Sequence, residues 1–209
     1  MVKVKVCGIK TIEHAEAAVK AGADAVGFIF AESRRKISPC RAKEISDTIP
    51  ASVLKIGVFV DADREEIEKT AQEANLDCVQ LHGSETVDFM KSLSVPAYKA
   101  LPIKEKKDLV GIGDYPGNFI LVDSGHGAAR GGNGTTFDWS YLENVSIDKR
   151  VILAGGLNLE NVRSAIEKVN PFMVDVSSGV ETDGIKDVRK INEFIFKVKN
   201  SSRMKEEVQ

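Results

Sequence analysis

Short apolar runs rich in valine, isoleucine and phenylalanine alternate with amphipathic stretches along the chain. A run of about four to eight such residues is typical of a β-strand, whereas apolar residues spaced three and four apart are typical of a helix. We predict strands at residues 2–7, 24–30, 53–60, 77–81, 96–101, 118–123, 150–154 and 172–176. We predict helices at residues 11–21, 39–48, 62–74, 84–92, 104–112, 138–143, 158–168 and 186–199.

The two kinds of segment alternate strictly, which gives eight strands and eight helices. Such alternation indicates parallel β-α-β units, because two parallel strands need a crossover that is usually a helix. Eight units favour a sheet that closes on itself, and an open doubly wound sheet is the alternative. The predicted fold class is therefore α/β, a single-domain (β/α)8 TIM barrel. The fifth and sixth helices have the weakest patterns, since Gly111, Gly113 and Pro116-Gly117 interrupt the fifth and the sixth is short.

Nothing in the composition divides the chain of 209 residues into two parts, since it holds no linker rich in proline, glycine or serine. We expect residues 1–199 to form the barrel and the polar residues 200–209 to form a frayed tail. Met1 is followed at once by alternating Val and Lys residues, which leaves no room for a signal peptide. No apolar run approaches the roughly 20 residues that span a bilayer. We therefore predict a cytoplasmic protein.

Charge and cysteine content narrow the function classes further. The net charge is −2, so general binding to nucleic acid or to an acidic membrane is not expected. The three cysteines, Cys7, Cys40 and Cys78, are an odd number without C-x-x-C spacing, so the sequence indicates neither a full disulfide framework nor a zinc knuckle. Three histidines, two of them near strand ends, do not make a catalytic metal site.

Two short turns of small residues follow the last two predicted strands. The first is Ala154–Asn158 and the second is Ser177–Glu181. Backbone N–H groups in such turns attract anions, and a barrel of this kind commonly holds a phosphate in the loops after its last two strands. Either turn alone would be an ordinary tight turn, but the pair indicates a phosphate site. Its candidate residues are Gly155, Gly156, Ser177, Ser178 and Gly179.

Other candidates for chemistry lie where the strands end, because the active site of such a barrel is built there. Cys7 ends the first strand near two lysines, so it is a candidate thiolate base, with a buried inert thiol as the alternative. Asp123 ends the sixth strand and suits a general acid, with a turn-stabilising aspartate as the alternative. His82 either orients a ligand or closes a turn, and Asp175 either pairs with a polar group of a substrate or braces the barrel interior.

Two loops add to this set. Arg34-Arg35-Lys36 brings positive charge to the mouth, where it could pair with a carboxylate or a phosphate, although most charge runs are simply solvated. The glycine-rich segment 124–136, with Gly131-Gly132-Asn133-Gly134, is long for a loop in a small domain and is a candidate lid.

Together these segments resemble the phosphoribosylanthranilate isomerase family of tryptophan biosynthesis, from residue 3 to about Asp187. Each piece is weak alone, but their order along the chain is specific. The matching pieces are Val4–Ile9, Gly22–Phe28, Ile37-Ser38-Pro39, Gly57–Val60, Val79–Gly83, Gly131–Gly134 with Thr136–Trp139, Ala154–Asn158 and Asp175–Glu181.

The resemblance implies an Amadori rearrangement of N-(5-phosphoribosyl)anthranilate to 1-(2-carboxyphenylamino)-1-deoxyribulose 5-phosphate, without cofactor or metal. Carried over to this sequence, Asp123 would be the general acid that protonates the furanose ring oxygen, and Cys7 the general base that removes the C2 proton. Arg35 would pair with the anthranilate carboxylate and Asp175 would position the substrate. The two late turns would hold the phosphate, and Gly132 and Gly134 would shape the sixth loop over it.

The chain departs from the family pattern at Glu32 and Lys36, where a proline and an aromatic residue are common. The carboxylate partner could therefore be Arg34, Arg35 or Lys36. The expected partner of the protein is a small phosphorylated, carboxylate-bearing substrate, and the chain is expected to be a monomer or a homodimer.

Two other classes stay open from the residues alone. A metal-dependent epimerase would need histidine and aspartate ligands, with only His82 and His126 near strand ends, and a Schiff-base aldolase would need a strand lysine such as Lys99. A non-catalytic sensor of phosphorylated metabolites would keep the phosphate turns but would need neither Cys7 nor Asp123.

Overall fold

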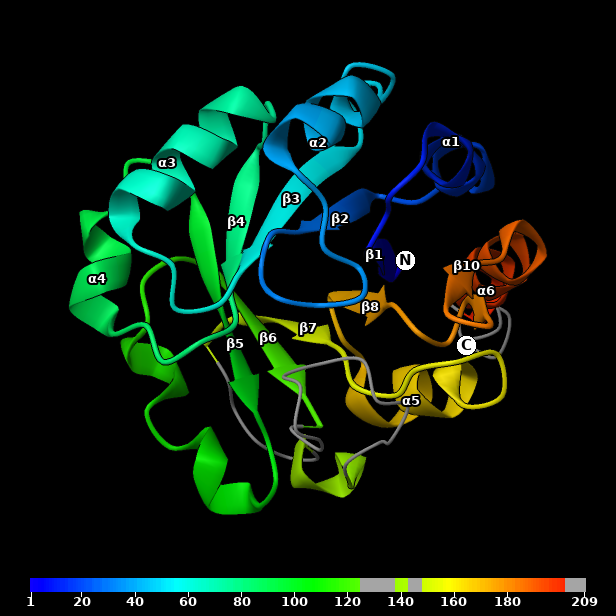
Figure 1. Ribbon diagram of the computed structural model, residues 1–209. Coiled ribbons are helices and arrows are strands. Elements are labelled where there is room, and N and C mark those ends of the chain that lie inside the picture. The colour runs from blue at the N-terminus through cyan, green and yellow to red at the C-terminus, as the bar shows by residue number, and fades with distance from the viewer. Residues whose placement is uncertain (125–137, 143–147, 202–209) are drawn as a thin grey trace.

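The computed structural model describes residues 1–124, 138–142 and 148–201. Eight parallel strands are hydrogen-bonded in chain order, and the eighth pairs with the first, so that the sheet closes into a barrel (Figure 1). This confirms the predicted (β/α)8 barrel. The strands are β1 (Lys3–Cys7), β2 (Ala25–Ile29), β3 (Leu54–Phe59), β4 (Cys78–Leu81), β5 (Ala97–Pro102), β6 (Phe119–Asp123), β7 (Arg150–Leu153) and β8 (Met173–Val176).

Helices cover the outside of the barrel (Figure 1). The α-helices are α1 (Ile12–Ala21), α2 (Pro39–Ser46), α3 (Arg64–Glu73), α4 (Val87–Ser92), α5 (Val162–Val169) and α6 (Val188–Ser201). Three 3₁₀ turns are η1 (Lys106–Leu109), η2 (Ile112–Asp114) and η3 (Trp139–Leu142). Within the described residues, no helix is long and apolar enough to cross a membrane.

Strand alternation sorts the side chains into two apolar layers. Outward residues such as Val4 and Val6 of β1 join one large cluster with the buried faces of the helices. Inward residues from every second position fill the barrel itself, among them Ile56, Tyr98 and Leu121. Because neighbouring residues of a strand point to opposite faces, a polar residue in an inward position faces the barrel interior. This rule places Lys5 and Cys7 of β1 inside.

Helices α1 and α2 begin within one residue of the predicted starts, and the other four α-helices begin two to four residues later. The hydroxyls of Thr11 and Ser38 accept hydrogen bonds from the backbone N–H groups of His14 and Arg41, and thus cap α1 and α2. The side chain of Asp63 caps α3 in the same way.

The helix predicted at 104–112 does not form, and the described part of the short helix predicted at 138–143 is a 3₁₀ turn and not an α-helix. The segment predicted as a helix at 104–112 consists of η1 and the start of η2, because Gly111 has a φ of +81° that breaks the helical path. The described part of the segment after β6 is the single 3₁₀ turn η3.

The region after β8 also differs from the prediction of a helix that begins at residue 186. Residues 181–186 form a small hairpin of two strands, β9 (Glu181–Thr182) and β10 (Ile185–Lys186), which pair antiparallel. Helix α6 follows at Val188 and continues to Ser201, two residues into the predicted tail. Residues 202–209 of that tail lie outside the described residues.

Candidate active site

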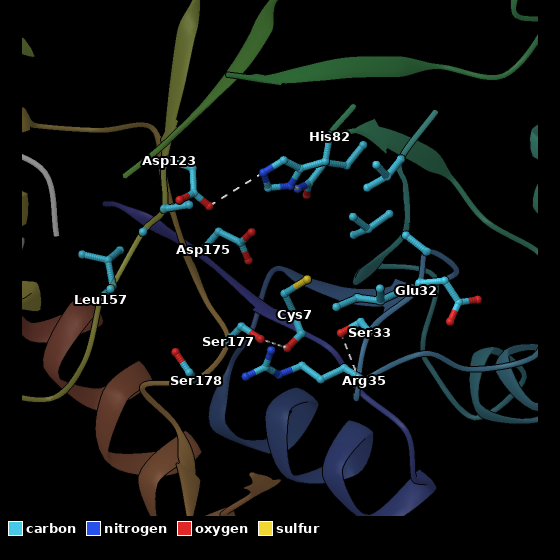
Figure 2. Close-up of a pocket in the computed structure, with 18 residues that line it drawn as sticks. Cys7, Glu32, Ser33, Arg35, His82, Asp123, Leu157, Asp175, Ser177 and Ser178 are labelled. Carbon is cyan, nitrogen blue, oxygen red and sulfur yellow. Dashed lines mark hydrogen bonds and ion pairs between the residues drawn. The ribbon is translucent and has the colours of Figure 1, made fainter. Parts of the chain in front are cut away.

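A cavity of about 420 Å³ opens at the carboxyl ends of the strands. It lies at the end of the barrel where enzymes of this fold carry out their chemistry. The predicted site residues among its polar lining side chains come from β1, β6, β8 and the loops after β2, β4 and β8 (Figure 2). They are Cys7, Arg35, His82, Asp123, Asp175, Ser177 and Ser178.

The inward alternation of the strands brings the predicted acid and base into one cavity. Cys7 is the last residue of β1 and Asp123 the last residue of β6, and both line the cavity and are buried. Two strands, β7 and β8, separate them around the barrel. A substrate placed between them would therefore meet a thiol and a carboxyl group from different directions.

Gly27 leaves the space that the thiol needs. It lies beside Cys7 in the parallel register of β1 and β2, and a side chain there would come within 2.8 Å of the Cys7 sulfur. A β-carbon at Gly27 would also meet the Lys5 side chain at 3.2 Å, so that Lys5 and Cys7 lie against the same strand position.

The electrostatic environment of Cys7 differs from what its sequence context suggests. Burial raises the pKa of the thiol, while the positive charges of Lys5 and Lys186 act in the opposite direction and Asp175 adds to the rise. The free enzyme therefore holds Cys7 as a thiol, contrary to the lowered pKa that the nearby lysines in the sequence suggest.

A chain of polar side chains runs from Lys5 in the barrel interior along the lining of the cavity to Asp123. The Lys5 ammonium donates hydrogen bonds to Asp175 Oδ2 at 2.8 Å and to Gln80 Oε1 at 2.9 Å. The Gln80 amide lies 3.1 Å from His82 Nδ1, and His82 Nε2 lies 3.9 Å from Asp123 Oδ2. Burial lowers the pKa of His82, an effect that the charge of Asp123 opposes. Although burial by itself would lower the pKa of Lys5, the adjacent Asp175 raises it, so that this lysine stays charged.

One carboxylate oxygen of Asp175 is bound by Lys5, and the other is available to a ligand. Its Oδ2 accepts from Lys5, while its Oδ1 is buried and has no hydrogen-bond partner within the part of the chain that the structure describes. A buried oxygen that accepts no hydrogen bond costs free energy. A ligand hydroxyl or N–H group in the cavity would remove this cost by donating a hydrogen bond to Oδ1.

The two small-residue turns lie side by side at one edge of the cavity. Asn158 and Gly179 form an isolated parallel bridge, which joins the turn after β7 to the turn after β8. Gly155 and Gly156 have φ values of +85° and +66°, a backbone path that side chains disfavour. Cavity-lining members of the two turns are Ala154, Gly155, Gly156, Leu157, Ser177 and Ser178.

Gly179 does not line the cavity but holds the turns together. A β-carbon at this position would fall 1.9 Å from the Leu157 carbonyl oxygen, a contact that no side chain tolerates. Gly179 is therefore a close-packing position between the two turns, and its predicted part in phosphate binding stays a prediction.

The structure separates the three consecutive basic residues. Arg35 is buried and lines the cavity, whereas the Arg34 side chain is 58% exposed and Lys36 pairs with the exposed Glu32. Of the three, only Arg35 faces the cavity.

Some predicted residues lie elsewhere. Gly132 and Gly134, most of the glycine-rich loop 124–136 and His126 lie outside the described residues. Tyr98 points into the barrel, and because neighbouring residues of a strand point to opposite faces, Lys99 points outward. The Lys99 ammonium pairs with Glu85 at 2.5 Å, and Lys99 does not line the cavity. Among the described residues no group of three or more His, Cys, Asp or Glu side chains is placed to hold a metal ion.

Sequence reasoning missed Lys5, Gln80 and Glu181. Lys5 and Gln80 occupy inward strand positions two residues before Cys7 and His82, a period-two signal that the sequence does carry. Glu181 contacts Arg35 from 146 residues away, which no local pattern reports.

The fold and site together define a (β/α)8-barrel enzyme that places a thiol and a carboxyl group in one pocket, with two joined turns of small residues at its edge. Residues 4–197 match the family described as N-(5'phosphoribosyl)anthranilate (PRA) isomerase. The chain is 50% identical over 203 residues to the N-(5'-phosphoribosyl)anthranilate isomerase of Bacillus cereus strain B4264, which covers 96% of this chain and 100% of the relative.

Solved structures of phosphoribosyl anthranilate isomerases superpose on this chain. The phosphoribosyl anthranilate isomerase of Thermotoga maritima superposes with a TM-score of 0.88 at 41% identity and covers 96% of this chain and 100% of its own. A phosphoribosyl anthranilate isomerase in complex with reduced 1-(o-carboxyphenylamino)-1-deoxyribulose 5-phosphate has a TM-score of 0.85 at 40% identity, with 96% and 100% covered. The chain belongs to the phosphoribosylanthranilate isomerase family and is an isomerase of tryptophan biosynthesis.

Proposed function

We propose that Cys7 and Asp123 are the general base and the general acid of this isomerase. The observation that carries the proposal is that both are buried residues of one cavity, on strands separated by two others, beside the two joined turns. A reaction that adds a proton to the ring oxygen and removes one from C2, the carbon next to C1, uses two such groups.

The steps follow from this placement. Asp123 donates a proton to the furanose ring oxygen as the C1–O bond breaks, and the nitrogen lone pair forms the C1=N bond of a protonated Schiff base. The Cys7 thiolate then takes the proton from C2, and the C–H electron pair becomes the C1=C2 bond of an enolamine. Tautomerisation moves the hydroxyl proton of C2 to C1 and leaves the ketone. Acid–base steps of this kind contribute about 10²- to 10⁴-fold each.

The substrate also explains how a thiol with a raised pKa can act as a base. The Schiff base carries a positive charge, which makes the proton on C2 acidic and stabilises a thiolate nearby. Lys5 and Lys186 already act on Cys7 in the same direction. Ionisation of the thiol is therefore favoured at the stage of the reaction that requires it.

The remaining residues of the cavity bind the substrate. Arg35 pairs with the anthranilate carboxylate, Asp175 Oδ1 accepts a hydrogen bond from a ribose hydroxyl, and His82 orients the sugar beside Asp123. The N–H groups and hydroxyls of the turns at Gly155-Gly156 and Ser177-Ser178 hold the phosphate. Each of these four assignments rests on a side chain or turn that lines the cavity.

The described residues give the other hypotheses less support. An aldolase would need Lys99 in the cavity, but Lys99 points outward and is held by Glu85. A sensor without activity would not need a buried thiol and a buried carboxyl group in one cavity, and both are present.

We also propose that the chain acts in the cytoplasm as a monomer or a homodimer on this phosphorylated, carboxylate-bearing substrate. The Thermotoga maritima relative is called dimeric, and monomers have been made from it. Light scattering after size-exclusion chromatography distinguishes the two states.

The roles of Cys7 and Asp123 are tested with Cys7→Ala and Asp123→Ala. Each should lower turnover by at least about 10²-fold while the variant still binds the reduced product analogue, because binding is assigned to other residues. Turnover within about threefold of the unmodified chain in either variant would overturn that assignment.

A further inference from the structure

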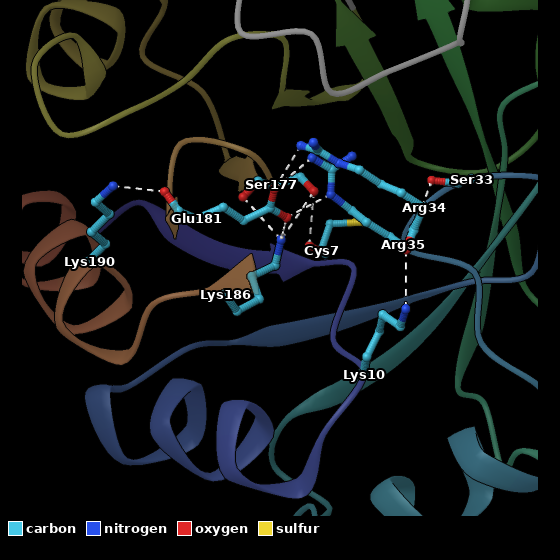
Figure 3. Close-up of polar contacts among 9 residues, drawn as sticks. All are labelled: Cys7, Lys10, Ser33, Arg34, Arg35, Ser177, Glu181, Lys186 and Lys190. Carbon is cyan, nitrogen blue, oxygen red and sulfur yellow. Dashed lines mark hydrogen bonds and ion pairs between the residues drawn. The ribbon is translucent and has the colours of Figure 1, made fainter. Parts of the chain in front are cut away.

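The small hairpin β9–β10 places a carboxylate directly behind Arg35 (Figure 3). Glu181 is buried, and its side chain is 4% exposed. Its Oε1 accepts from Arg35 Nε at 2.6 Å and its Oε2 accepts from Arg35 Nη2 at 2.8 Å. Glu181 itself does not line the cavity, whereas Arg35 does. The carboxylate therefore touches the arginine and does not touch a ligand in the cavity.

These two bonds use one edge of the guanidinium. A guanidinium has five N–H donors and can hold a carboxylate in a fork at either of two edges, one formed by Nε and Nη2 and one by Nη1 and Nη2. Glu181 occupies the first edge. Nη1 has no hydrogen-bond acceptor within residues 1–124, 138–142 and 148–201, so that the second edge is available to a ligand.

The charge of the cluster formed by Arg34, Arg35, Glu181 and Lys186 favours the binding of a second anion. Arg34, Arg35 and Lys186 all pair with the same carboxylate of Glu181, which leaves two positive charges in excess among these four groups. Although burial would raise the pKa of Glu181, hydrogen bonds from Arg35 and Lys186 lower it to about 2, so that this carboxylate stays ionised at neutral pH.

Contacts with neighbouring residues also fix the side chains of this cluster. Lys186 donates to the backbone carbonyl of Ser177 at 3.1 Å, and Lys190 donates to the backbone carbonyl of Glu181 at 2.7 Å. The Arg35 side chain packs over Gly8, where an added β-carbon would come within 2.7 Å of Arg35 Cδ. These contacts leave Arg35 few rotamers, and a fixed guanidinium loses less entropy when it binds an anion.

We propose that Glu181 is a positioning residue, which holds Arg35 by one edge so that the other edge forks the carboxylate of the substrate. This inference rests on the proposed role of Arg35. It assigns to the β9–β10 hairpin the selection of a carboxylate-bearing substrate over one that lacks the carboxylate.

The test compares two ligands in calorimetry: reduced 1-(o-carboxyphenylamino)-1-deoxyribulose 5-phosphate and the same compound with a plain phenylamino group. The unmodified chain should bind the carboxylate compound about 10- to 100-fold more tightly, the range of a charge-assisted fork. In Glu181→Gln this preference should fall below about threefold, while affinity for the phenylamino compound changes by less than about threefold. A merely structural role would weaken both ligands equally.

Three controls separate the outcomes. Arg35→Gln should remove the preference, and adding Glu181→Gln to it should change little more, because both act through one contact. Arg34→Gln should keep the preference, since Arg34 touches the same carboxylate but does not face the cavity. Glu181→Asp, which keeps the charge but shortens the reach, replaces Glu181→Gln if the latter does not fold.

Two results would overturn the inference in different ways. A preference that survives in Glu181→Gln at full size would remove the positioning role and leave Arg35 as the carboxylate partner. Equal affinity of the unmodified chain for both ligands would show that Arg35 does not bind the carboxylate, and the inference would fall with that assignment.

Discussion

At the scale of single residues, Lys5 is the charged group with the largest effect on the pKa of Cys7, the proposed base. It is fully buried, pairs with Asp175 and lies against the same glycine as the Cys7 sulfur. A buried ammonium is costly unless it is paired, and here it is held by a carboxylate and an amide oxygen. Its charge favours the thiolate, whereas burial disfavours it.

Replacing Lys5 by methionine should therefore raise the pKa of Cys7 further. The rate at which iodoacetamide alkylates the Cys7 peptide, followed by mass spectrometry, should reach its half-maximum at a higher pH than in the unmodified chain, and the acidic limb of kcat should move in the same direction. Lys5→Arg, which keeps the charge, is the control and should shift the alkylation profile and the acidic limb of kcat less than Lys5→Met does. An unchanged alkylation profile in Lys5→Met would contradict an electrostatic role for Lys5.

The acid stability of the protein gives a second prediction at this scale. The pKa of Glu181 is about 2, against 4.5 for an ordinary glutamate, so its ionised form stabilises the fold fully above pH 4.5 and less as the pH falls toward 2. This contribution is on the order of 3 kcal/mol. Glu181→Gln should lower the free energy of unfolding at pH 6, measured with urea, and the gap between the two proteins should narrow as the pH falls through that range. A gap that stays constant with pH would contradict the lowered pKa.

At the scale of elements, the two turns proposed to bind the phosphate are joined to each other. They come from different β-α connections but meet at Asn158 and Gly179, where the backbones approach too closely for any side chain. The proposed phosphate site therefore depends on contact between the turns as well as on the N–H groups within each.

Gly179→Ala should push the turns apart. We expect a loss of about 1–3 kcal/mol in stability, the usual effect of overpacking, and a raised KM for the phosphorylated substrate. Gly113→Ala is the matched control, because a β-carbon there meets nothing within 4 Å and that glycine has no positive φ. Denaturant titration and steady-state kinetics on both variants provide the check. A KM in Gly179→Ala equal to that of Gly113→Ala would contradict the role of the turns in phosphate binding.

The elements also show what the sequence could predict. The eight strands are short, β-branched and punctuated by turn residues, so that their places are predicted to within about two residues. The amphipathic pattern at 104–112 predicts a fifth helix, but Gly111 with its positive φ breaks it. The hairpin β9–β10 was missed because strands of two residues carry no periodicity.

The sequence likewise predicts some residues of the site and misses others. The sequence could place Cys7, Asp123 and Asp175 at the cavity because each occupies an inward position at or near the end of a strand. Glu181 and Lys5 depend on partners far away in the chain, and the contacts exist only after the barrel has closed.

At the scale of the whole molecule, the barrel closes through its two ends. Strand β8 pairs with β1, and helix α6 packs against α1 and α5. The buried face of α6 consists of Ile191, Phe194, Ile195 and Val198. Burying a side chain of this size stabilises a protein by about 1.5–3 kcal/mol, so that the four together approach the whole net stability of a typical domain, about 5–15 kcal/mol.

A chain that ends at Asp187 should therefore fail to unfold cooperatively, because it lacks α6. A chain that ends at Ser201 keeps α6 and should melt within a few degrees of the unmodified protein. Circular dichroism during heating measures both. A cooperative transition in the shorter chain would contradict the dependence of the barrel on α6.

The central claim, a phosphoribosylanthranilate isomerase driven by Cys7 and Asp123, is tested most directly by fluorescence. Purified protein is mixed with freshly generated phosphoribosylanthranilate in the presence of EDTA, and the loss of the anthranilate-type fluorescence is followed. The account predicts a rapid loss that the chelator does not slow and that is abolished in both Cys7→Ala and Asp123→Ala. A folded, unmodified protein without turnover, or full turnover in either variant, would contradict it.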